Sequence, residues 1–206
     1  MRLRQRGDTI IEVLFAVTVF AMVAVGSMTI MNQGTAAAQR ALEISLVRQQ
    51  IDAQAEAIRY IHQAYVSTYQ RQGAPPSGAA GEWRKMTVDR AAASASNFAE
   101  LQDGRCPTSV PGDSPFILNA RRAAVSTAAI QMTPPADGSM PPFAQVDYNT
   151  DSSIRQAYGL WVEAVPSTNP NGQPGFVDFH IRACWDGPGS STPMTLGTIV
   201  RLYEPR

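Results

Sequence analysis

Residues 10–31 read IIEVLFAVTVFAMVAVGSMTIM, an apolar stretch whose only formal charge is that of Glu12. An α-helix rises about 1.5 Å per residue, so a helix of this length can cross a hydrocarbon core about 30 Å thick. A carboxylate inside such a helix costs about 2.5–3.5 kcal/mol on insertion scales. A charge that is kept at this position therefore indicates that the chain uses it. The alternative is that Glu12, near the membrane edge, extends to the cytoplasmic headgroups.

The residues before the apolar stretch are basic, and they lead into Gly7. Three arginines stand there: Arg2, Arg4 and Arg6. Positive residues that flank a membrane segment stay on the cytoplasmic side. We therefore expect residues 1–7 in the cytoplasm and the rest of the chain outside it.

Three interpretations of this segment compete. A signal peptide that is cleaved behind its apolar core would need a shorter core, and no good A-x-A cleavage site follows this one. An uncleaved signal anchor explains the length and the orientation, but it does not explain Glu12. The third interpretation places a cleavage site before the apolar stretch, between Gly7 and Asp8.

In this third interpretation the run RGDTIIEVLFAVTVF resembles the N-terminus of type IV prepilins and type II secretion pseudopilins. Those proteins have a short basic leader that ends in Gly, one mature residue, and an apolar helix with Glu at mature position five. If Asp8 is the first mature residue, Glu12 is the fifth. The resemblance covers residues 1–31 in detail and the helix that follows in outline.

The resemblance implies a maturation and assembly route. A membrane aspartyl prepilin peptidase would cleave after Gly7, and the new amine of Asp8 would pair with Glu12 of a neighbouring subunit. It also implies N-methylation of the new terminus. The implied partners are other pilin subunits through the N-terminal helix, the inner pilus assembly machinery and the membrane. The implied locations are the cytoplasmic membrane and then an extracellular pilus or a periplasmic pseudopilus.

Two departures from the family pattern favour a minor pilin. The first mature residue of the family is usually Phe or Met, whereas Asp8 stands here, and the proline that often kinks the helix of major pilins is absent. The roles implied for such a subunit are adhesion, motility or DNA uptake. A secretion pseudopilin fits the same residues. An uncleaved, signal-anchored extracytoplasmic domain is the alternative outside the family.

The helical pattern continues beyond Met31, with Gly34 as a weak point. Apolar residues recur at steps of three and four: Ile44, Val47, Ile51, Ala55, Ile58, Ile61 and Tyr65. The charged side chains are assigned to the opposite face: Arg40, Glu43, Arg48, Asp52, Glu56 and Arg59. We predict one nearly continuous helix over residues 9–70, whose apolar stripe covers a sheet. A coiled coil is the alternative for the stripe.

The sequence thus divides into a leader (1–7), a transmembrane and assembly half of the helix (8–31), an amphipathic half (32–72) and a head (73–206). In the head we expect three antiparallel strands, at Ala157–Val165, Phe176–Trp185 and Leu196–Tyr203. The predicted fold class is α+β, a long N-terminal helix packed on a C-terminal antiparallel sheet, as in pilins.

The remainder of the head gives weaker signals. We expect a turn over 73–81, a short strand at Trp83–Val88, and a short helix at Asp89–Leu101 capped by Asp89. Residues 105–115 and 134–142 are expected as loops. The pattern of Phe116–Met132 does not distinguish strands from helix.

Two cysteines, Cys106 and Cys184, lie too far apart in sequence for a metal-binding pair. Export would favour a disulfide between them, since oxidising compartments preserve such bonds. The loop it closes would be worth about 4 kcal/mol in the chain-entropy model. Two unpaired buried thiols are the alternative. In the pilin family a disulfide commonly ties the C-terminal region to the sheet.

Composition and motifs exclude several functions. The full chain has 17 basic and 17 acidic residues, and loss of the leader would leave a charge near −3, so no basic footprint for nucleic acid is expected. P-loop, G-x-S-x-G and dinucleotide motifs are absent from the sequence. We therefore expect no enzymatic activity and no cofactor.

Several polar and aromatic residues have ordinary structural explanations. His62 and His180 belong to no metal-ligand or catalytic pattern. Asp147, Asn149 and Asp151 alternate like the start of a calcium loop but lack its later Gly and Glu, so we predict an Asx-rich turn and no metal. The three tryptophans are expected in the core: Trp83, Trp161 and Trp185.

Overall fold

The computed structural model describes residues 10–69, 77–96, 105–126, 128–132, 143–167 and 175–205. The chain divides into two compact units, residues 1–41 and residues 42–206. The predicted loop at 134–142 and residues 73–76 of the predicted turn at 73–81 lie outside the described residues, and the end of that turn is helical.

One helix, α1 (Ile10–Tyr69), runs from the first unit into the second. This confirms the long helix that the sequence predicts, and Gly34 does not interrupt it. Within residues 10–41 nearly every side chain is exposed. No side chain in this part of α1 is buried by the chain itself, as expected for a helix whose apolar surface faces lipid or other chains.

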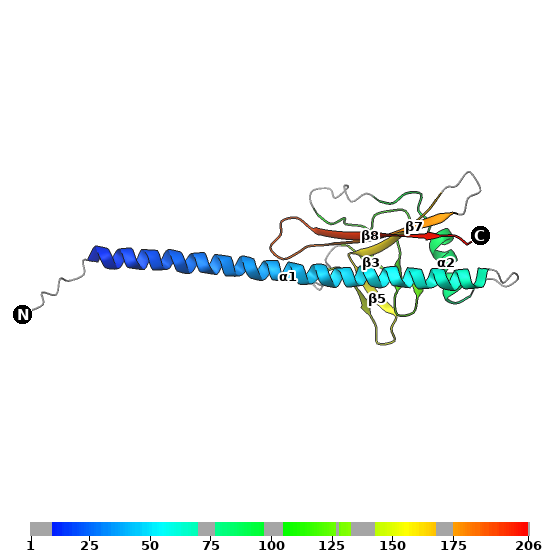
Figure 1. Cartoon of the computed structure of the whole chain (residues 1–206), viewed down its shortest axis with the longest axis horizontal. Helices are drawn as coiled ribbons and strands as arrows, with labels where there is room; N and C mark the ends of the chain where they lie inside the picture. The colour runs from blue at the N-terminus through cyan, green and yellow to red at the C-terminus, as the bar shows by residue number, and fades with distance from the viewer. Residues whose placement is uncertain are drawn as a thin grey trace, which may run out of the picture. The chain divides into compact units, whose positions relative to one another are not determined.

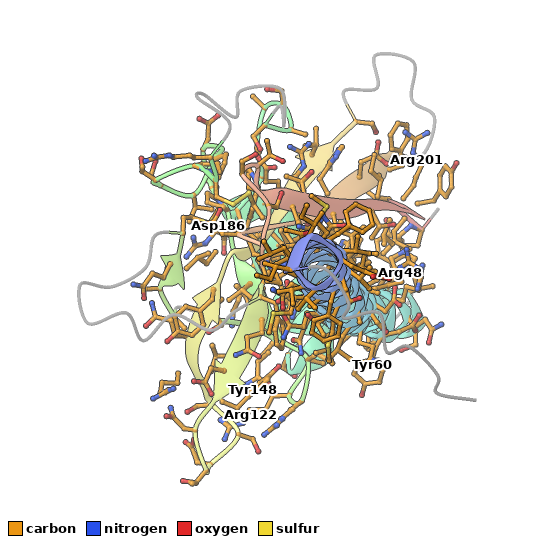
Figure 2. The ribbon with its side chains drawn as sticks, turned by 90° about the vertical axis from the view of Figure 1, so that its left-hand side faces the viewer. Arg48, Tyr60, Arg122, Tyr148, Asp186 and Arg201 are labelled. Carbon is orange, nitrogen blue, oxygen red and sulfur yellow. A yellow bond between two sulfur atoms is a disulfide. The ribbon has the colours of Figure 1, made fainter. Side chains whose placement is uncertain are left out.

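Residues 42–69 of α1 bury the predicted stripe in the core of the second unit. Val47, Ile58 and Ile61 are fully buried, and Ile51 and Ala55 are each 3% exposed. Ile44 and Tyr65 pack against the same core at its ends. Arg48 and Tyr60 project to solvent from other sides of the helix (Figure 2). The step-of-three-and-four pattern therefore identifies the packed face correctly.

The largest sheet is antiparallel, in the order β6-β7-β8. Its strands are β6 (Leu160–Pro166), β7 (Phe176–Trp185) and β8 (Met194–Tyr203). Two of the three predicted strands, Phe176–Trp185 and Leu196–Tyr203, are thereby confirmed. β7 and β8 run along residues 42–69 of α1 (Figure 1), and their inner side chains share one core with the helix stripe.

Two smaller sheets complete the head. β1 (Ile117–Asn119) and β2 (Ala124–Ser126) form an antiparallel hairpin. The other sheet has the order β3-β5-β4, with β3 parallel and β4 antiparallel to β5. Its strands are β3 (Ile130–Gln131), β4 (Gln145–Tyr148) and β5 (Ile154–Tyr158). The undecided segment Phe116–Met132 is thus built of short strands.

The predicted strand at Trp83–Val88 is wrong. The chain instead forms α2 (Ala79–Arg84), followed by a π-helical turn, η1 (Lys85–Asp89). Trp83 and Met86 are three residues apart and only 2% and 0% exposed. Helical spacing puts both side chains on the same side, where they enter the core.

The predicted helix at Asp89–Leu101 is wrong over its described part. Asp89 ends η1 and does not cap a helix, and residues 90–96 are not helical. Ala91 and Ala92 pair with Ala164 instead: the Ala92 N–H donates to the Ala164 carbonyl at 2.8 Å. Pairing with the outer edge of β6 stabilises this segment more than its weak helical preference does.

The predicted strand at Ala157–Val165 is two strands in different sheets. The break is Gly159, whose φ of 57° ends β5 and starts β6. A side chain on Gly159 would place its Cβ 2.2 Å from the Cys184 carbonyl oxygen. The corner therefore requires glycine both for its backbone angle and for its space.

Candidate functional site

The N-terminal half of α1 is the candidate site. Its large apolar side chains are exposed, for example Ile10 at 78% and Phe20 at 75%. By length and composition, this helix could span a membrane. A surface of this kind is unfavourable in water, and lipid or the helices of other chains would bury it.

The hydroxyl groups of this segment are satisfied within the helix. Thr18 donates to the carbonyl oxygens of Leu14 at 2.7 Å and Phe15 at 2.9 Å. Ser27 donates to Val23 at 2.8 Å, and Thr29 donates to Val25 at 3.0 Å. Back-bonding of this kind leaves no hydroxyl proton unpaired in lipid.

Glu12 is different from these hydroxyls. It is the single formal charge in residues 10–31, and its carboxylate has no hydrogen-bond partner among the described residues. A carboxylate accepts hydrogen bonds and cannot be satisfied by the carbonyl groups of its own helix. Glu12 therefore has to find a cation or a donor outside the described chain. Gly7 and Asp8, which the sequence joins to this site, lie outside the described residues.

The predicted disulfide between Cys106 and Cys184 is confirmed. The sulfur atoms are 2.09 Å apart and the Cα atoms 5.7 Å apart. Cys184 is buried in a small cluster with Met132 and Trp161 on the sheet face opposite α1. The bond ties the loop around Cys106 to β7.

Glu43 was expected on the charged face of the helix, and this expectation is wrong. The side chain is 8% exposed, and its Oε2 accepts a hydrogen bond from Trp185 Nε1 at 3.1 Å. Glu43 stands four residues before Val47, so helical spacing places it in line with the buried stripe. The helical spacing would have placed Glu43 on the buried face if polar residues had been counted as part of the stripe.

A second buried carboxylate, Glu163 on β6, was missed entirely. It is 0% exposed and accepts hydrogen bonds from the backbone N–H of Ser96 at 3.0 Å and from its hydroxyl at 2.7 Å. Arg182 Nε lies 3.7 Å from the carboxylate. The sequence carries no signal for this network, because the loop that covers Glu163 is far away along the chain.

His62 occupies a structural position, whereas His180 lines a surface pocket. The Nε2 of His62 lies 2.8 Å from the Tyr203 carbonyl oxygen, and the ring contacts Trp83. Burial lowers the pKa of His180, and the nearby Arg182 lowers it further. The His180 ring is therefore mainly neutral at neutral pH.

The carboxylates of the D-x-N-x-D run do not converge. Asp147 pairs with Arg155, whereas the Oδ1 of Asp151 accepts bonds from the Ser153 backbone and hydroxyl in a turn. Among the described residues, no group of three His, Cys, Asp or Glu could hold a metal ion. The predicted Asx turn and the burial of all three tryptophans are confirmed.

Comparisons with known proteins do not extend these observations: no protein-family model matches the chain, and no curated protein or solved structure matches it.

Proposed function

We propose that this protein is a minor type IV pilin-like subunit. It is synthesised as a prepilin, held in the membrane by α1, and cleaved after Gly7 by a prepilin peptidase. The mature chain then joins an extracytoplasmic filament that serves adhesion, motility or DNA uptake. The amine created on Asp8 pairs with Glu12 of a neighbouring subunit.

The observation that carries this proposal is the isolated charge of Glu12. Hydroxyls in the same helix are paired internally, and the apolar surface around them is open. An unpaired buried carboxylate is strongly penalised, whereas one with a cationic partner is not. Assembly that brings the Asp8 amine of one subunit to Glu12 of the next would remove this penalty and fix the axial register.

A type II secretion pseudopilin is the second candidate, because it would share the leader, the helix and Glu12. A signal-anchored extracytoplasmic domain is the alternative from another class. The signal-anchored domain differs from the pilin and the pseudopilin because it requires neither cleavage nor a filament.

The test is intact mass and N-terminal sequencing of the protein from native membranes, with and without the prepilin peptidase. We expect a mature chain that begins at Asp8 and depends on that enzyme. The same mass shows whether Asp8 carries a methyl group. An uncut chain that begins at Met1 in the presence of the peptidase would contradict the pilin proposal.

A further inference from the structure

Sheet edges present unpaired backbone N–H and C=O groups, and proteins usually cover them. This chain does so with specific side chains. Glu82 accepts a hydrogen bond from the Val125 N–H of β2 at 2.8 Å. Gln54 of α1 bonds both backbone groups of Leu118 in β1, at 2.8 and 2.9 Å.

The outer edges of β4 and β6 also have hydrogen-bond partners. Gln50 of α1 accepts from the Val146 N–H of β4 at 3.5 Å. The outer edge of β6 pairs with Phe116 through two backbone bonds to Val162. Each of these strands therefore has a described partner along the side that its sheet leaves open.

β8 is the exception among the described edge strands of three or more residues. It pairs with β7 over ten residues without a bulge, and it contains no proline. The Glu204 N–H donates to the Gly175 carbonyl at 2.9 Å, so these two residues form a hydrogen-bonded pair. Because such pairs alternate along an antiparallel ladder, the backbone groups of Thr195, Gly197 and Ile199 point away from β7.

This open edge is uncharged over Met194–Val200 and exposed at its centre. Ile199, a large apolar residue, is 60% exposed. The devices that usually blunt an edge, such as lysine, proline or a bulge, are absent from these residues. Among the described residues, side chains cover only the far end of the edge, where His62 contacts the Tyr203 carbonyl.

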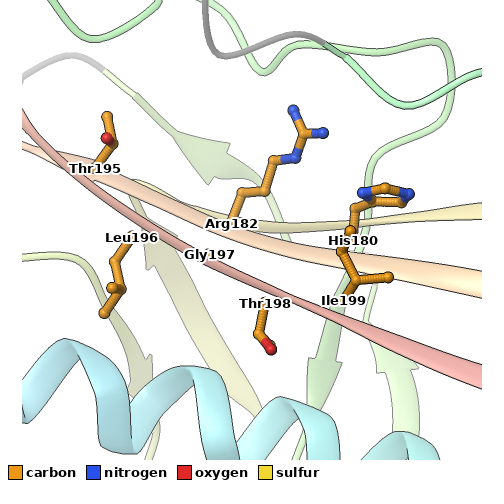
Figure 3. Close-up of a pocket in the computed structure, with 7 residues that line it drawn as sticks. All are labelled: His180, Arg182, Thr195, Leu196, Gly197, Thr198 and Ile199. Atoms are coloured by element: carbon orange, nitrogen blue, oxygen red, sulfur yellow. The ribbon is translucent and has the colours of Figure 1, made fainter.

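A pocket of about 320 Å³ lies on the same edge (Figure 3). Its lining comes from β7 and β8: His180, Arg182, Thr195, Leu196, Gly197, Thr198 and Ile199. Gly197 stands opposite Arg182 in the ladder, so the missing side chain leaves room above the sheet. His180 has no hydrogen-bond partner among the described residues, and its neutral ring offers one donor and one acceptor.

A second copy of this chain does not fit the edge. β8 runs along residues 42–69 of α1 (Figure 1). Antiparallel β8–β8 pairing would make these helices run in opposite directions, whereas anchoring by the same end requires them to run in the same direction. Parallel β8–β8 pairing would need a twofold axis along the strands, whereas copies in a filament are related by a screw axis and meet through different surfaces. Another copy would therefore have to offer a different edge, and the other long edges described above are covered.

We propose that Thr195–Ile199 of β8 binds an extended segment of a different pilin-class subunit by strand addition, and that one side chain of this segment enters the pocket above Gly197 and hydrogen-bonds His180. This inference rests on the proposed filament function, because it supplies a contact between heads in addition to the helix contact at Glu12. In strand addition, main-chain bonds give affinity and a side-chain pocket gives specificity.

The test is photo-crosslinking of the full chain in native membranes and filaments. A photoreactive residue is placed at Ile199 in one strain and at Val17, on the helix, in another. We expect the Ile199 probe to yield an adduct with an extended segment of a different pilin-class subunit, identified by mass spectrometry of the joined peptides. The Val17 probe is expected to join subunit helices.

The probes at Ile199 and Val17 distinguish a failure of the edge inference from a failure of the filament proposal. Subunit adducts at Val17, with none or only a second copy of this chain at Ile199, would overturn the edge inference and leave the filament proposal standing. An absence of subunit adducts at both positions would overturn both.

A substitution series tests the edge itself, with the photoreactive residue moved to Thr195. Ile199→Lys should lower the adduct yield at least about tenfold, because a lysine blunts an edge. Val88→Lys is the matched control, since Val88 is 61% exposed and Ile199 60%, and Val88 lies on η1. Ile199→Pro removes an outward N–H without breaking a β7 bond, so it should have the same effect as Ile199→Lys. Unchanged yields in both Ile199 variants would overturn the inference.

Discussion

At the scale of single residues, the charge of Glu12 has opposite effects on the two steps: it disfavours insertion into lipid and favours assembly with a neighbouring subunit. In lipid the carboxylate costs about 2.5–3.5 kcal/mol on insertion scales, whereas a cation in a neighbouring subunit would compensate it. Thr18, six residues further along, is a polar residue that its own helix satisfies. The two residues therefore respond differently to substitution.

Glu12→Gln should leave membrane insertion intact and reduce filament recovery at least about tenfold, since about 1.4 kcal/mol per contact already gives that factor. Thr18→Val should assemble like the wild type. The measurement is the ratio of the protein in the sheared filament fraction to that in the membrane fraction. Equal ratios for Glu12→Gln and the wild type would contradict the role assigned to Glu12.

Glu163 gives a prediction about stability. Glu163→Ala removes the carboxylate beside Arg182, whose side chain is only 11% exposed and keeps its bonds to Ser96. Removing one partner of a buried pair costs about 3–5 kcal/mol. The expected result is a loss of this size in the free energy of unfolding, measured by guanidinium denaturation of the full chain in detergent.

The control for Glu163 is Asp178→Ala, which breaks the more exposed pair with Arg201. The side chains there are 50% and 18% exposed for Arg201 and Asp178. Exposed pairs contribute about 0–1 kcal/mol, so this variant should lose much less than Glu163→Ala. Similar losses in both variants would show that the buried network does not stabilise the head as argued.

The sequence predicts apolar burial better than polar burial. The stripe on α1 is found from its spacing, because apolar side chains must leave water wherever the helix packs. Glu43 and Glu163 are buried by partners that lie far along the chain, Trp185 and Ser96. A polar residue is tolerated in the core when such a partner exists, and no local pattern reveals the partner.

At the scale of secondary-structure elements, long regular patterns predict structure well and short ones do not. α1, β7 and β8 repeat their pattern over ten residues or more. The segment Trp83–Val88 is too short for periodicity to distinguish a strand from a helical turn. The contacts of Trp83 and Met86 with the core decide its structure, and these contacts are tertiary.

Gly159 tests the corner between β5 and β6. Gly159→Ala introduces a Cβ 2.2 Å from the Cys184 backbone oxygen at a φ of 57°. We expect a loss of about 1–3 kcal/mol in the free energy of unfolding, since backbone strain of this type costs that much and the clashing atom belongs to the main chain. Guanidinium denaturation of the full chain measures it.

Gly34→Ala is the comparison for Gly159. Gly34 lies inside α1, and nothing stands within 4 Å of a Cβ added there. Alanine favours a helix over glycine by about 0.5–1 kcal/mol, so this variant should be neutral or slightly more stable. A destabilisation as large as that of Gly159→Ala would argue against the special role of the corner.

At the scale of the whole molecule, the α+β class follows from the order of a long helix and later strands. The division of the strands into three sheets does not. β3 joins β5 in parallel across an intervening segment, and β1 reaches β6 through one bridge at Phe116. Such long-range pairings depend on the packed geometry of the head and leave no periodic signal.

The disulfide tests how the outer layer is attached to the sheet. Cys106 and Cys184 are 78 residues apart, and closing a loop of that size is worth about 4 kcal/mol in the chain-entropy model. Neither cysteine belongs to the main core that α1 forms with the sheet. The pair should therefore stabilise the fold without determining it.

The variant that replaces both cysteines with alanine should keep the fold and lose up to about 4 kcal/mol in the free energy of unfolding. Circular dichroism reports the fold, and guanidinium denaturation in detergent reports the loss. The oxidised wild type, and the wild type reduced in denaturant and then refolded, are the references. The reduced wild type should match the double variant closely, because both lack the cross-link. An unchanged denaturation midpoint in the double variant would contradict the chain-entropy value, because that stabilisation comes from restricting the unfolded chain and does not depend on other native contacts.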